Sequence, residues 1–139
     1  MTSSLFLPYL FAILVSSGAH GIGTAVNLTN DQFSIARQIH YEALEQGLDP
    51  KKVILLAECE SGLKLNARGD LRTETGEYMA YGIFQWWQQS WDFYTKKYNL
   101  DLDRENPIHQ IKLTALVLKN KGGGDWKNCS RKLGILARR

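Results

Sequence analysis

Apolar residues recur along this chain at the three- and four-residue intervals of amphipathic helices. A capping box of Thr29 and Gln32 opens the first such stretch, and Gly47 ends it. Asp49 and Gly62 bracket the second stretch in the same way. The pattern predicts four helices, over residues 29–47, 49–62, 89–98 and 106–122. The chain is therefore expected to be mainly α-helical.

The second predicted helix carries an acid where its hydrophobic pattern continues. Successive helical residues are about 100° apart, so Glu60 falls on the apolar face, whereas Glu58 lies about 200° away from it. That face consists of Val53, Leu56, Ala57 and Glu60. A carboxyl held there loses part of its hydration, which raises its pKa and suits it to donate a proton near neutral pH. The alternative is a helix-terminal glutamate that points into water.

A polar segment follows this helix before the chain returns to the core. Residues 68–77 are interrupted by Gly69 and Gly76 and are expected to form a loop or a small two-stranded hairpin. Ile83 and Phe84 then resume the apolar pattern.

Three sequence blocks are informative when they are taken together. Leu48-Asp49-Pro50 opens the Glu60 helix, Glu60-Ser61-Gly62 ends it, and Ala80-Tyr81-Gly82-Ile83-Phe84-Gln85 follows the polar segment. In these blocks the chain resembles the soluble lytic transglycosylase family of the lysozyme-like superfamily, over about residues 33–129. The resemblance implies a lysozyme-like helical domain, of the goose-type lysozyme and transglycosylase kind, with a small hairpin or loop lining the cleft.

The resemblance also implies a reaction and the residues that take part in it. A lytic transglycosylase cleaves the β-1,4 bond between N-acetylmuramic acid and N-acetylglucosamine in peptidoglycan and leaves a 1,6-anhydro product, without a cofactor. The single catalytic acid of the family maps onto Glu60, and Ser61 is expected to support its carboxyl through a hydrogen bond. The other expected substrate-binding residues are Tyr78, Tyr81, Gln85 and Trp126.

The chain departs from the family pattern at two places. Lys64-Leu65-Asn66 stands where the family has Asn-Pro, and the segment of residues 68–79 is longer and more charged than the family loop. Both departures leave the acid in place and bear on the details of the substrate.

Two other functions stay open. A lysozyme-type hydrolase would use Asp70 or Glu74 as a second carboxylate, because hydrolysis with either stereochemical outcome needs one. A cell-wall glycan-binding relative would bind the polymer without turnover.

Length and composition fit one exported domain. The chain has 139 residues, and its 44% hydrophobic content is enough for a core. An almost unbroken apolar run from Leu5 to Val15, followed by small residues, predicts a signal peptide over residues 1–19 and export to the periplasm or the cell exterior. No Lys or Arg precedes that run, so an uncleaved membrane anchor is the alternative. A single domain is expected over residues 20–139, with its core over about 29–130 and a basic tail over 131–139.

The formal net charge of +3 adds little to the choice of partner. A basic tail can steer a protein toward anionic polymers, although a solvated tail is the more usual explanation and the one we favour. No nucleic-acid-binding motif accompanies the tail, so no nucleic-acid partner is expected. The family resemblance implies that the partner is the glycan strand of peptidoglycan, and a single small domain is expected to be a monomer.

The two cysteines are expected to form a disulfide. In an exported chain, a bond between Cys59 and Cys129 would hold the last segment against the Glu60 helix and stabilise the fold by about 4 kcal/mol. The alternatives are two free thiols, or a nucleophilic cysteine that works with His40 or His109. The spacing of the histidines and cysteines matches no metal-binding motif, so no metal is expected.

Overall fold

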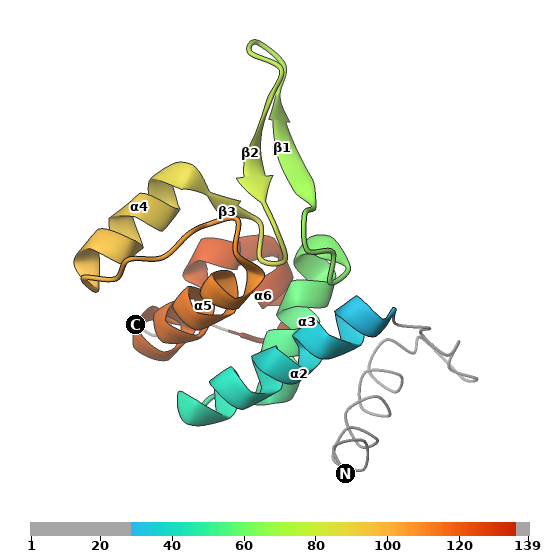
Figure 1. The fold of residues 1–139 in the computed structure, drawn as a ribbon, viewed down its shortest axis with the longest axis vertical. Coiled ribbons are helices and arrows are strands. Elements are labelled where there is room, and N and C mark those ends of the chain that lie inside the picture. The colour runs from blue at the N-terminus through green and yellow to red at the C-terminus, as the bar shows by residue number, and fades with distance from the viewer. Residues whose placement is uncertain (1–28, 136–139) are drawn as a thin grey trace.

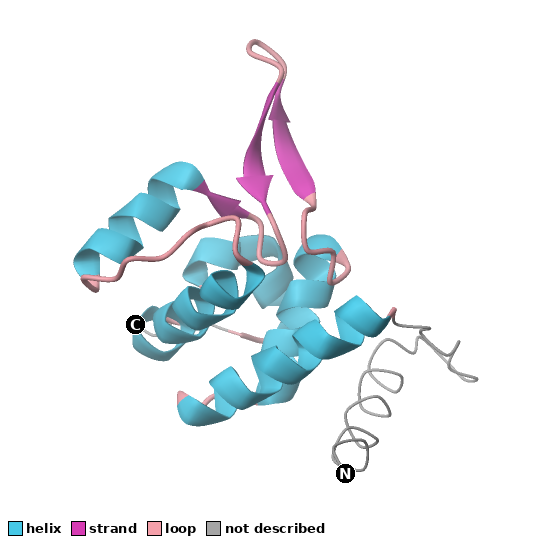
Figure 2. Ribbon diagram, viewed as in Figure 1, coloured by secondary structure: helices cyan, strands magenta, loops and turns pink. Residues whose placement is uncertain are grey.

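The computed structural model describes residues 29–135 and shows a mainly helical domain with a small antiparallel sheet (Figures 1 and 2). Its helices are α2 (Asn30–Glu45), α3 (Pro50–Ser61), α4 (Gln88–Lys97), α5 (Pro107–Lys121) and α6 (Lys127–Leu133), with a 3-10 helix η1 (Gly124–Trp126) before α6. Its strands are β1 (Arg68–Arg72), β2 (Glu77–Tyr81) and β3 (Trp86–Trp87). The expected signal peptide over residues 1–19 lies outside the described residues.

The helix starts are those that the capping residues predict. The Thr29 hydroxyl accepts a hydrogen bond from the Gln32 amide, and the Gln32 side chain accepts one from the Thr29 amide. Asp49 and Asn106 cap α3 and α5 through their side-chain oxygens. Local sequence therefore determines where these three helices begin.

The C-terminal segment differs from the prediction. Helix α6 continues to Leu133, and the Ile135 amide donates to the carbonyl of Ser130. Leu133 and Ile135 also pack against the core. Residues 131–135 thus belong to the folded domain, because two apolar side chains interrupt the basic run that suggested a solvated tail.

Two groups of buried side chains make up the core. Helices α2, α3 and α5 pack through aliphatic residues, including Ile39, Ile54, Leu56 and Leu113, each fully buried. An aromatic cluster joins the sheet to α4 and η1 through edge-to-face contacts of the Trp86 ring with Trp91, Tyr94 and Trp126. The cluster anchors the base of the sheet on the helical core.

The sheet has the strand order β1-β2-β3, and β1 and β2 form a hairpin that projects from the helices (Figures 1 and 2). Two rows of paired residues cross it: Gly69, Ala80 and Trp87 in one, and Arg68, Tyr81 and Trp86 in the other. Because neighbouring residues of a strand point to opposite sides, these rows define two faces. We call them the Trp87 face and the Tyr81 face.

The predicted disulfide between Cys59 and Cys129 is confirmed. It joins α3 to α6 across 70 residues of sequence, with a Cα–Cα distance of 5.8 Å. Within residues 29–135, none of the helices is both long and apolar enough to cross a bilayer.

Candidate active site

Glu60 occupies the last turn of α3, and its environment favours the protonated acid. Its side chain is partly buried, and this desolvation, together with the charge of Asp70, raises its pKa from the ordinary 4.5 to about 6. Burial also raises the pKa of Glu58 on the same helix, but the Asp70 charge does not contribute there. The two acids are therefore distinguished by Asp70, which lies close enough to act on Glu60.

Three contacts hold the end of α3 in place. The Ser61 hydroxyl lies 2.8 Å from the Ile83 carbonyl and 3.1 Å from that of Ala57. The Gln32 side chain donates to the Gly62 carbonyl at 2.8 Å, and the disulfide at Cys59 adds a covalent link. Ser61 therefore supports the acid through the backbone, and its hydroxyl is directed to carbonyl oxygens rather than to the carboxyl, where we expected it.

The turn of residues 82–85 brings Gln85 onto the Trp87 face. Gln85 adopts the left-handed conformation, with φ 51°, and its amide nitrogen donates to the carbonyls of Gly82 at 2.8 Å and Ala67 at 3.1 Å. The side-chain amide lies where a Cβ of residue 69 would be, so only glycine fits at Gly69 without displacing it. Gln85 is thus rigidly held.

A buried glutamine on α5 also holds this turn in place through hydrogen bonds. Gln110 of α5 is 1% exposed, and its amide nitrogen donates to the carbonyls of Tyr81 and Arg104 at 3.0 and 2.7 Å. Its oxygen accepts from the Phe84 amide at 3.2 Å, and its side chain occupies the space that a Cβ of Gly82 would need. The only sign in the sequence that Gln110 holds this turn was its place, as a polar residue, within the apolar face of a helix.

Asp70 and Trp87 form a second fixed pair beside Glu60. Asp70 has φ 53°, an unusual conformation inside a strand, and its carboxylate accepts a hydrogen bond of 2.8 Å from the Trp87 indole nitrogen. The Trp87 ring remains 39% exposed. Sequence reasoning missed this residue, although strand alternation predicts that one of two adjacent tryptophans is buried and the other faces out.

Two of the expected substrate-binding residues line cavities that Glu60 does not line. Tyr81 belongs to the Tyr81 face and lines two cavities, of about 490 and 530 Å³, and Tyr78 lines the smaller of the two. Asp70, in contrast, lies close enough to the candidate acid for its charge to raise the pKa of Glu60.

The sequence did not show whether Trp126 and Glu74 would be buried or exposed, and the structure places them differently. Trp126 is 5% exposed and donates its indole proton to the Phe84 carbonyl at 2.8 Å. It lines a small cavity of about 60 Å³, together with Gln85 and Trp87. Glu74 is exposed in the turn that joins β1 to β2, at the end of the hairpin that points away from the helices (Figure 1).

No residues of this site form an evident metal centre. Within residues 29–135, no three His, Cys, Asp or Glu side chains are grouped so that they could hold a metal ion. Comparisons of the chain with protein-family models, with curated proteins and with solved structures find no match. The chemistry of the site is therefore argued from its own residues: one acid with a raised pKa, one neighbouring carboxylate, an exposed indole and a fixed amide.

Proposed function

We propose that this protein is a lysozyme-like peptidoglycan lytic transglycosylase in which Glu60 is the general acid and base. The observation that carries the proposal is the position of this carboxyl, partly buried in the last turn of α3 with the Asp70 carboxylate nearby, which raises its pKa to about 6. At pH 7 roughly a tenth of the molecules then hold the proton, about thirtyfold more than for a carboxyl of ordinary pKa. Such a group can protonate a leaving oxygen and afterwards accept a proton.

The reaction needs one proton to move twice. Glu60 gives its proton to the glycosidic oxygen as the bond to the muramyl C1 breaks, and it becomes a carboxylate. It then takes the proton of the muramyl 6-hydroxyl, whose oxygen bonds to C1 and closes the 1,6-anhydro ring. The acid is restored, and neither water nor a second carboxylate is consumed.

The surroundings of Glu60 suit a sugar chain. The exposed indole of Trp87 offers a flat apolar surface, and its hydrogen bond to Asp70 fixes its orientation. Gln85 lies on the same face, and its hydrogen bonds to Gly82 and Ala67 both use the amide nitrogen, so its oxygen can accept from a sugar hydroxyl. We assign the sugar-binding role to these two residues.

Export of the protein belongs to the same proposal. The Cys59–Cys129 disulfide supports a periplasmic or extracellular location, because such bonds persist in oxidising compartments. The expected partner is the glycan strand, and the expected state is a monomer.

A lysozyme-type hydrolase is the second candidate, and one observation favours it. Asp70 lies near enough to raise the pKa of Glu60, which is where a nucleophile or general base would be needed. One of its carboxylate oxygens already accepts the Trp87 proton. We therefore assign Asp70 to positioning and electrostatics and let the reaction products decide.

Mass spectrometry of the products tests the proposal. Purified peptidoglycan is incubated with the protein, with Glu60→Gln and with Glu58→Gln, a matched change of a partly buried acid on the same helix. We expect 1,6-anhydro products from the native protein and from Glu58→Gln, and at least about a thousandfold loss of rate in Glu60→Gln.

The other outcomes are equally informative. Products with a reducing muramyl end would establish the hydrolase. Equal losses in both variants would show that Glu60 has no special part. Binding of peptidoglycan without products from any of the three proteins would support the glycan-binding alternative.

A further inference from the structure

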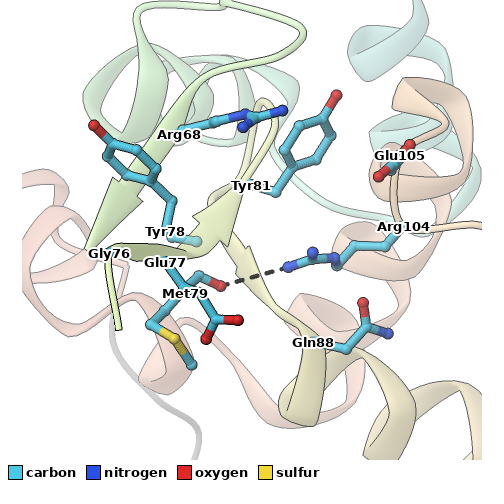
Figure 3. Close-up of a pocket in the computed structure, with 10 residues that line it drawn as sticks. Arg68, Gly76, Glu77, Tyr78, Met79, Tyr81, Gln88, Arg104 and Glu105 are labelled. Carbon is cyan, nitrogen blue, oxygen red and sulfur yellow. Dashed lines mark hydrogen bonds between the residues drawn. The ribbon is translucent and has the colours of Figure 1, made fainter. Parts of the chain in front are cut away.

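One of the two openings that Tyr81 lines is a groove that the proposed reaction does not use. It has a volume of about 490 Å³ and lies between the hairpin and the chain that leads into α5 (Figure 3). Its charged and aromatic lining residues are Arg68, Glu77, Tyr78, Tyr81, Arg104 and Glu105. Glu60, Gln85 and Trp87 do not line this groove, so a ligand in it would not occupy the candidate active site.

Arg104 is fixed in the groove and still has donors to offer. One terminal nitrogen donates to the carbonyls of Trp86 at 2.9 Å and Met79 at 3.4 Å, and the guanidinium lies 5.7 Å from the centre of the Tyr81 ring. Its Nε is buried and has no hydrogen-bond partner. That buried atom is out of a ligand's reach, but the hydrogen bonds to Trp86 and Met79 use only one of the two terminal nitrogens, so the other can donate to an anion in the groove.

Arg68 provides a second guanidinium from the opposite side. Its side chain reaches across β2 toward the Tyr81 ring (Figure 3). Within residues 29–135 the only ion pair between side chains joins Lys121 to Asp125, so neither arginine is neutralised by a carboxylate. Each guanidinium can pair with a carboxylate, and the phenol ring that lies near both offers a flat apolar surface for a small side chain.

The groove also contains negative charge. Glu77 and Glu105 line it, and neither forms an ion pair with Arg68 or Arg104. A ligand that carried only negative charges would be repelled by these carboxylates. A ligand with carboxylate and ammonium groups complements both the arginines and the glutamates of the groove.

We propose that this groove binds short peptides with free carboxylates and free amines, with the carboxylates on Arg68 and Arg104 and the amines toward Glu77 and Glu105. The peptide side chains of peptidoglycan belong to this class. The idea that the groove holds such a peptide while Glu60 acts on a glycan strand rests on the proposed function. The binding of an isolated peptide to the groove does not depend on it.

Calorimetric titration of the full protein with a sugar-free peptide tests this site. The probe is the synthetic tetrapeptide L-Ala-γ-D-Glu-L-Lys-D-Ala with free termini, compared with the same peptide amidated at its carboxyls and acetylated at its amines. We expect saturable binding of the free peptide and at least about tenfold weaker binding of the blocked one, since two charge-assisted contacts are lost.

Variants assign the binding to the groove. Arg68 is exposed, so Arg68→Ala should leave the melting temperature unchanged and weaken the free peptide about tenfold, with partial recovery in Arg68→Lys. Arg72 is the matched control, because it is exposed on the same strand and lies outside the groove lining. Arg72→Ala should keep the affinity within about twofold.

Three results would overturn the site: no saturable binding, equal affinity for the blocked peptide, or equal losses in Arg68→Ala and Arg72→Ala. The two proposals fail separately. Peptide binding by a protein that never cleaves peptidoglycan supports the groove alone, and cleavage without peptide binding supports the active site alone.

Discussion

The Trp87 face and the Tyr81 face are carried by the same three strands but present opposite chemistry. On the Trp87 face, one carboxylate, Asp70, raises the pKa of Glu60 and orients an indole. On the Tyr81 face, Arg68 and Arg104 stand unneutralised around a phenol ring. A change of one residue in strand position therefore moves a side chain from the side of the candidate acid to a groove that carries charges of both signs.

Two of the four non-glycine residues with a left-handed backbone among residues 29–135 belong to the Trp87 face. These are Asp70 and Gln85, and the conformation costs of order 1 kcal/mol for a residue with a Cβ. Both side chains are also fixed by hydrogen bonds, Asp70 to Trp87 and Gln85 to the Gly82 carbonyl. Strain that is retained and supported in this way is typical of functional sites, and it distinguishes the Trp87 face from the groove.

The largest expected effect is on stability and concerns the disulfide that anchors the helix carrying Glu60. Replacing both cysteines, Cys59→Ser with Cys129→Ser, removes a 70-residue closure and should lower the free energy of unfolding by about 4 kcal/mol. Urea denaturation of the native and the double-serine protein measures this loss. A loss below about 1 kcal/mol would show that the helices hold α3 and α6 together without the bond.

A paired substitution sharpens the contrast between the faces. Trp87→Leu should lower kcat/KM for peptidoglycan about tenfold, because a stacking surface next to Glu60 is lost, while Tyr81→Leu should keep kcat/KM within about twofold. Initial rates and melting temperatures of both variants measure this difference. The opposite ranking would return the sugar-positioning role to Tyr81, as the family resemblance implies.

The raised pKa of Glu60 should be visible in stability. Between pH 4.5 and about 6 the folded protein binds this proton more tightly than the unfolded chain does, so its contribution to stability is lost as the pH rises through that window. The rise in pKa corresponds to about 2 kcal/mol, which partial exposure reduces to about 1 kcal/mol.

Glu60→Gln removes this pH-dependent loss. The variant should therefore be about 1 kcal/mol more stable than the native protein at pH 7, and equally stable near pH 4. Denaturation at both pH values makes the measurement. A variant that is less stable at pH 7 would mean that the folded state favours the ionised carboxylate.

The smallest effect concerns Asp70→Asn, which tests how the carboxylate acts. Burial is the larger cause of the raised pKa, so the variant should lower the pKa of Glu60 by only part of the interval between about 6 and 4.5. The alkaline limb of the pH–activity profile should move to lower pH by the same amount, with the maximal rate retained. Loss of about a thousandfold in rate would instead identify Asp70 as the second carboxylate of a hydrolase.

Much of the Glu60 side was accessible from the sequence because it depends on local rules. Helical periodicity placed Glu60 at the edge of the apolar face, and the caps at Asp49 and Gly62 gave the bounds of the helix that carries it. The expected export of the chain to an oxidising compartment predicted the Cys59–Cys129 disulfide. The role of Ser61 was less accessible, since the direction of a hydroxyl depends on a carbonyl 22 residues away.

The sequence by itself determined the helical class, the helix starts and the position of the candidate acid, since each follows from spacing or residue type within a short segment. It also determined the disulfide, because two cysteines in one chain allow a single intramolecular pair. Only the tertiary structure decided which side chains meet the acid. Strand pairing placed Tyr81 and Trp87 on opposite faces of the sheet and brought Trp87 to Asp70, and the buried Gln110 fixed the turn that precedes β3. Register is set by long-range packing, and a single step in it exchanges the two faces of a strand.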